Sequence, residues 1–105
     1  MIYELRTYRL KVGAVAEFLA ILDELMPHLE RNGGAPLGVW TTDVGTLNEV
    51  TQLYGWNDFA HRTEVNARWK ADAEPRKGAL QLRARDLMIH QEAKLLQPAP
   101  FSRMK

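Results

Sequence analysis

Residues 15–29, VAEFLAILDELMPHL, decide how the rest of the chain is interpreted. Their apolar side chains recur at the i, i+3, i+4, i+7 spacing of one face of an α-helix: Val15, Phe18, Leu19, Leu22, Leu25, Met26 and Leu29. We expect this helix, over about residues 14–31, to be the main packing element of the core. The residues expected to be among the most buried are Phe18, Leu22, Leu25 and Leu29.

Pro27 lies late in this pattern and has no amide proton to donate. We therefore expect the helix to kink or break near Met26. Asn32-Gly33-Gly34 is a typical helix end, and Gly13 marks a turn just before the helix.

Four runs around this helix favour β-strands. Residues 2–10 (IYELRTYRL) alternate in character, and 37–44 and 48–56 are separated by Gly45-Thr46-Leu47, a hairpin signal. Residues 87–96 (LMIHQEAKLL) are the last expected strand.

A second helix is expected over about residues 58–73, because Asn57-Asp58 can cap its start. Residues 75–85 indicate a short helix or a turn after Pro75. The resulting order, βαββαβ, is the ferredoxin-like arrangement. We predict an α+β fold with a four-stranded antiparallel sheet and helices on one face, as a single domain over residues 1–105 with a loose tail at 97–105.

The composition of the chain excludes several kinds of chemistry and location. The chain of 105 residues has no Cys, and its 14 basic and 13 acidic residues give a net charge of +1. Disulfides and thiol chemistry are therefore excluded. The start MIYELRTY lacks a signal-peptide core, and no apolar run approaches the ~20 residues of a membrane span. We expect a soluble, cytoplasmic protein with no membrane partner.

Nucleic-acid binding is not expected either. Residues 61–85 contain seven basic and three acidic residues, but aromatic side chains for base stacking are sparse there apart from Trp69. A solvated basic face is the favoured interpretation of this region.

Several catalytic and nucleotide-binding motifs are absent. Ser102 is the only serine and lies in the C-terminal tail, and neither a Gly-x-Gly-x-x-Gly nor a phosphate-binding loop occurs. His61 and Glu64, three residues apart, are too few for a metal site. His28 is best interpreted as a cation at a helix end. We predict no metal and no cofactor.

Strand alternation suggests which polar and aromatic side chains could share an interior cavity. The cavity is expected either between the sheet and the helices or between paired sheets. If Tyr3 and Leu5 face the helices, the other set of the first strand points toward a partner sheet. The same reasoning in the other strands gives these candidate ligand-binding residues: Arg6, Tyr8, Trp40, Gln52, Tyr54 and His90. Two alternatives remain open, a dimer-interface network of Glu4, Arg6 and Tyr8 without a ligand, and an exposed edge-strand position for His90.

Several segments together resemble the NIPSNAP family. They are ELRTY at 4–8 before Gly13, the arm from Asn48-Glu49-Val50 to Gly55-Trp56, the Asn57-Asp58 helix start, and Gln91-Glu92 with the ending Leu95-Leu96-Gln97-Pro98. The resemblance spans nearly the whole chain, in the same order and spacing. It departs from the family at Gln52-Leu53-Tyr54, where a His or an aromatic pair is frequent.

The resemblance implies a dimeric α/β barrel, in which two ferredoxin-like sheets pack together, and it carries over no catalytic residue. The first functional hypothesis is a small-molecule-binding or interaction domain that acts as a homodimer. The alternative is a cofactor-independent oxygenase or isomerase, which needs only a desolvated pocket, a base and a few donors. A regulatory ligand-binding module ranks last, because no DNA-binding segment is attached.

Overall fold

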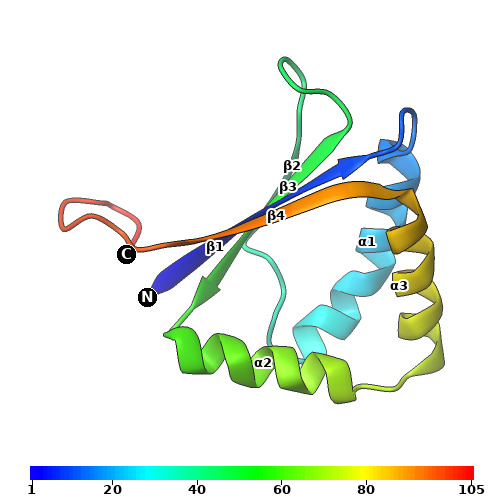
Figure 1. Ribbon diagram of the computed structural model, residues 1–105. Coiled ribbons are helices and arrows are strands. Elements are labelled where there is room, and N and C mark those ends of the chain that lie inside the picture. Colours follow the sequence, from blue (N-terminus) through cyan, green and yellow to red (C-terminus); the bar gives the residue numbers. More distant parts are fainter.

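The chain folds into one antiparallel sheet with three helices on the same side (Figure 1). The computed structural model describes residues 1–105. In chain order its elements are β1 (Ile2–Leu10), α1 (Val15–Arg31), β2 (Gly38–Thr41), β3 (Glu49–Trp56), α2 (Phe59–Ala71), α3 (Pro75–Leu87) and β4 (Met88–Leu96). The strand order β2-β3-β1-β4, with every pair antiparallel, confirms the predicted α+β, ferredoxin-like sheet.

The helix α3 is an addition to the predicted βαββαβ order. Residues 75–85 were expected to form at most a short helix, yet α3 has 13 residues. Pro75 suits the first helical turn, and the Glu74 carboxylate caps it by accepting from the amides of Arg76 (3.1 Å) and Lys77 (2.8 Å). Leu80 of α3 is fully buried beside α1, so this helix completes the core.

The helix α1 runs through Pro27 to Arg31, so the expected break near Met26 is wrong. Pro27 lies on the exposed side, where water can replace the missing hydrogen bond. Phe18, Leu22 and Leu25 are buried as predicted, whereas Leu29 is only half-buried. Ile21 is the most buried residue of this helix, because α3 covers its side of α1.

The strand bounds differ from the prediction mainly at the hairpin. The strand β2 ends at Thr41 instead of residue 44, and the loop before β3 includes Asn48 at a φ of +60°.

In α2, Asp58 accepts from the amide of His61 at 2.7 Å and so caps the helix as predicted. None of the three helices has both the length and the apolar content that a membrane crossing requires.

The two faces of the sheet are the reverse of what was expected for β1. Tyr8 and Leu10, not Tyr3 and Leu5, face the helices and pack with Phe18 in the main core. Both alternating sets of β1 contain apolar side chains, so alternation alone did not distinguish them. We call the side beneath the helices the covered face and the opposite side the open face.

Candidate functional site

A cavity of about 340 Å³ lies between the covered face of the sheet and the helices. Its apolar wall comes from α1 and from Trp69 of α2, and its polar wall comes from β1 and β3. Four of the six residues predicted from the sequence line it: Arg6, Tyr8, Gln52 and Tyr54. The register explains this grouping, since Arg6 is the direct cross-strand partner of Gln52 in the antiparallel pair of β1 and β3.

Glu4 is the centre of a buried hydrogen-bond network beside the cavity. Its side chain is completely buried, and its carboxylate accepts from Arg6 Nε (2.7 Å), Arg62 Nε (2.8 Å) and Trp56 Nε1 (3.0 Å). Burial by itself would raise the pKa of Glu4, but the hydrogen bonds from Arg62 and Arg6 outweigh it and lower the pKa to about 2. Glu4 is therefore a permanent carboxylate that holds two guanidinium groups in place.

Arg6 belongs both to the Glu4 network and to the lining of the cavity. Its Nη1 donates to the Tyr8 hydroxyl oxygen at 3.2 Å, and its guanidinium carbon lies 5.6 Å from the centre of the Tyr54 ring. Burial opposes the charge on Arg6, yet the oxygens of Tyr8 and Glu4 raise its pKa above the ordinary value. The side chain keeps 32% of its surface exposed, so a fixed positive charge reaches the cavity.

An aromatic stack continues from Arg6 toward α2. The rings of Tyr54 and Trp56 are parallel within 3° at a centroid distance of 5.7 Å, and His61 meets Trp56 edge-on. The Tyr54 hydroxyl donates to Gln52 Oε1. Burial raises the pKa of Tyr54, so its hydroxyl stays protonated at neutral pH.

The mouth of the cavity is formed by α3 and β4. The residues there include Gln81, Arg85, Met88 and Gln91, and Gln91 is the cross-strand partner of Tyr8. The complete lining contains two arginines and three glutamines, but no aspartate, glutamate or histidine. The cavity is thus positively charged and has no side chain with the pKa of a general base near pH 7.

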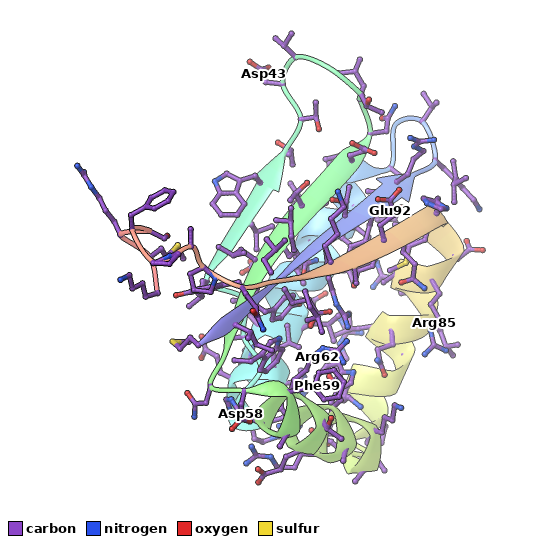
Figure 2. The ribbon with its side chains drawn as sticks, turned by 60° about the vertical axis from the view of Figure 1, so that its left-hand side comes forward. Asp43, Asp58, Phe59, Arg62, Arg85 and Glu92 are labelled. Carbon is purple, nitrogen blue, oxygen red and sulfur yellow. The ribbon has the colours of Figure 1, made fainter.

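Trp40 and His90, also predicted as ligand-binding residues, do not line this cavity. Trp40 pairs with Thr51 and His90 with Arg9, which places both on the open face. His90 Nε2 lies 3.3 Å from Glu92 Oε1, and more than half of each of these side chains is exposed. Figure 2 shows Glu92 on β4 and Arg62 on α2 at opposite sides of the sheet.

Two residues of the region interpreted as a solvated basic face are instead structural. Arg62 binds the buried Glu4, as described above. Lys77 is buried, and its Nζ donates to the carbonyl oxygens of Trp69 and Asp72 and lies 4.2 Å from the centre of the Trp69 ring. Lys77 therefore holds a wall of the cavity in place. No sequence signal separates these two cations from their solvated neighbours, because their partners are 58 and 8 residues away.

Comparisons with known proteins agree with this fold. Residues 3–103 match the NIPSNAP family. Human protein NipSnap homolog 3A is 34% identical over 73 residues, which are 69% of this chain and 29% of that protein, so this chain spans under a third of that relative's length. In the crystal structure of an uncharacterised NIPSNAP domain protein from Burkholderia xenovorans, 35% identity covers 97% of this chain and 98% of that chain, with a TM-score of 0.84.

A more distant structure shares the fold. A mutant of SnoaB, a cofactor-independent oxygenase from Streptomyces nogalater, has a TM-score of 0.68 at 16% identity, covering 99% of this chain and 97% of that chain. At this level of identity the likeness shows a shared fold. With the match over nearly its whole length, this chain belongs to the NIPSNAP family.

Proposed function

We propose that this chain is a small-molecule-binding domain whose site is the cavity under the covered face. The observation that carries the proposal is the cavity itself, about 340 Å³ in volume, with an apolar wall and a few polar groups that converge from β1 and β3. Volume and lining of this kind are typical of ligand pockets. The fixed network around Glu4 holds the polar wall in one geometry, which lowers the entropic cost of binding.

The alternative, a cofactor-independent oxygenase or isomerase, has less support from the lining. Such chemistry needs a proton acceptor within hydrogen-bond reach of the substrate. His90, the only one of the six candidate residues whose type commonly serves as a general base, lies on the open face. Tyr54 keeps its proton, and Arg6 keeps its charge. The cavity wall of this chain therefore suits recognition better than proton abstraction.

Binding in the cavity can be tested with the fluorescent probe 1-anilinonaphthalene-8-sulfonate. We expect saturable binding at one site per chain. Gln81→Trp should place an indole in the cavity mouth and weaken binding at least about tenfold. The matched control is Leu82→Trp, because Leu82 is the next residue of α3, is exposed and lies outside the lining. Equal binding by both variants would contradict the proposal.

We further propose that the domain acts as a homodimer through the open face. Apolar side chains gather on this face from three strands: Leu5 of β1, Leu53 of β3, and Leu96 of β4, which pairs with Tyr3. Trp40 of β2 adds an indole that is 53% exposed. A second copy packed on this face would bury these side chains, in the dimeric α/β-barrel arrangement that the family resemblance implies.

The dimer is tested by light scattering at micromolar concentration. The wild-type particle should have twice the chain mass of 12.0 kDa. Leu53→Arg introduces a charge at the centre of the open face and should give the monomer, whereas Leu82→Arg on the exposed side of α3 should leave the dimer intact. A wild-type protein that is monomeric under these conditions would contradict this part of the proposal.

A further inference from the structure

We infer that the cavity selects its ligand by a carboxylate group, bound by unused hydrogen-bond donors of Arg6, Gln52 and Tyr8. This inference rests on the proposed function and adds the chemical class of the ligand, a monocarboxylate with an apolar body. It is carried by the hydrogen bonds that these three side chains make within the protein and by those that they leave unmade.

Arg6 has one nitrogen free. Its Nε is bonded to Glu4 and its Nη1 to Tyr8, but Nη2 makes no hydrogen bond within the protein. No buried side-chain nitrogen or oxygen lacks a partner, so Nη2 is at least partly accessible, and Arg6 is one of the residues that line the cavity. This nitrogen presents two N–H groups of a guanidinium, whose charge strengthens any hydrogen bond to an anionic oxygen.

Gln52 adds a second donor. The residue is only 2% exposed, and its Oε1 is already occupied by the Tyr54 hydroxyl. Its Nε2 makes no hydrogen bond within the protein. Gln52 is the cross-strand partner of Arg6 and lines the same cavity, so the two side chains are neighbours on the covered face.

Tyr8 adds a third donor. Its hydroxyl oxygen accepts from Arg6 Nη1, and the hydroxyl proton is donated to no group of the protein. The deep polar wall therefore offers N–H and O–H groups, while its acceptors, the Glu4 carboxylate and Gln52 Oε1, are already occupied.

A wall of free donors with a fixed positive charge favours an acceptor-only, anionic group. A carboxylate has two oxygens with about four acceptor positions and no proton to donate, so it can engage all three donors. Arg85 at the mouth adds a second positive charge, and no acidic residue lines the cavity to repel an anion. The walls from α1 and Trp69 leave room for an apolar body, so an apolar monocarboxylate fits both halves of the site.

The experiment compares probes that share one apolar body: 2-naphthoate, neutral 2-naphthamide, 2-naphthylmethylammonium and 2-naphthyl phosphate, titrated by isothermal calorimetry. We expect 2-naphthoate to bind at least about tenfold more tightly than 2-naphthamide, because hydrogen bonds to a charged group are stronger than neutral ones. The ammonium probe should bind most weakly. Tighter binding of the phosphate than of 2-naphthoate would overturn the assignment to a carboxylate.

Three variants test whether the preference for the carboxylate probe depends on these donors. Tyr8→Phe removes one donor, and Gln52→Glu replaces another by a carboxylate beside Arg6, so both should reduce the preference for 2-naphthoate over 2-naphthamide. Tyr3→Phe removes a hydroxyl from the open face of the same strand and should leave the preference unchanged. Thermal unfolding of each variant shows whether it is folded.

The outcomes separate this inference from the proposed function. Equal affinities for 2-naphthoate and 2-naphthamide, both blocked by Gln81→Trp, would overturn the ligand class and leave the binding cavity standing. If neither the naphthyl probes nor 1-anilinonaphthalene-8-sulfonate binds, both the ligand class and the proposed binding cavity are overturned.

Discussion

The two faces of the sheet differ in how far their charged side chains are buried and paired. On the covered face, Glu4 is completely buried and is held by two arginines and an indole N–H. On the open face, Glu92 pairs only with His90, and both side chains are more than half exposed. Glu4 and Glu92 lie on strands that are direct neighbours, so the contrast arises from the helices, which cover one face and leave the other bare.

This difference indicates where the site must be. A buried ion pair is retained at a large desolvation cost, which surrounding hydrogen bonds have to offset. Here the network leaves donors of Arg6, Tyr8 and Gln52 unused, and all three residues line a cavity, whereas the open face presents separate side chains on a broad surface. The covered face is therefore suited to a small ligand, and the open face to a second sheet.

The largest expected effect follows from removing the buried carboxylate. Glu4→Ala leaves Arg6 and Arg62 without their shared partner and should lower the free energy of unfolding by about 3–5 kcal/mol. The matched change on the open face, Glu92→Ala, should cost less than ~0.5 kcal/mol when both changes are made in the monomeric Leu53→Arg chain, because exposed pairs contribute little. Urea denaturation of both variants measures the difference, and similar losses would remove the contrast between the faces.

The apolar half of the covered face gives the next effect. Leu22 of α1 is buried in the main core and lines the cavity, so Leu22→Ala should destabilise by about 2–5 kcal/mol through lost transfer free energy and an enlarged cavity. Leu82→Ala on the exposed side of α3 is the control and should change stability by less than ~0.5 kcal/mol. A loss below ~1 kcal/mol for Leu22→Ala would show that this side of α1 is not the core.

Acid should lower the free energy of unfolding, because Glu4 on the covered face becomes protonated. Its pKa is lowered from 4.5 to about 2 in the folded chain. A carboxylate with a depressed pKa contributes its full stability above the unfolded pKa, and this contribution is lost as pH falls from about 4.5 toward 2.

The Glu4→Gln variant isolates this contribution, because Asp72 and Glu74 also have lowered pKa values and add to acid unfolding in both proteins. The stability difference between wild type and Glu4→Gln should shrink between about pH 5 and about pH 2. A difference that is constant over this range in chemical denaturation would contradict the buried ion-pair network.

The sequence predicted the sheet and the first helix because their signals are local. The spacing of apolar residues along α1 and the alternation of β1 and β3 do not depend on distant contacts. It did not predict α3 as a full helix, since its apolar positions are few and Leu80 is buried only through packing against α1. Arg62 and Lys77 were assigned to solvent for the same reason, because their partners lie on other elements.

The candidate site was predicted in part. Arg6 with Tyr8 and Gln52 with Tyr54 were each grouped correctly, because residues two apart in a strand share a face. Which set of each strand faces the helices depends on pairing, which sequence alternation does not show when both sets contain apolar residues. That uncertainty is why Trp40 and His90 were grouped with the other four although they lie on the open face.

The smallest expected effect concerns His90, and it tests the assignment of the two faces most directly. His90 was a candidate ligand-binding residue on sequence grounds, but it pairs with Arg9 on the open face, and its side chain hydrogen-bonds to Glu92. We expect His90→Ala to leave the affinity for 2-naphthoate unchanged within about twofold and, in the monomeric Leu53→Arg chain, the stability unchanged within ~0.5 kcal/mol. Tyr8→Phe, one position from Arg9 but on the covered face, should weaken the same binding. If His90→Ala weakens binding as much as Tyr8→Phe does, the ligand occupies the space between paired open faces, and the roles of the two faces are reversed.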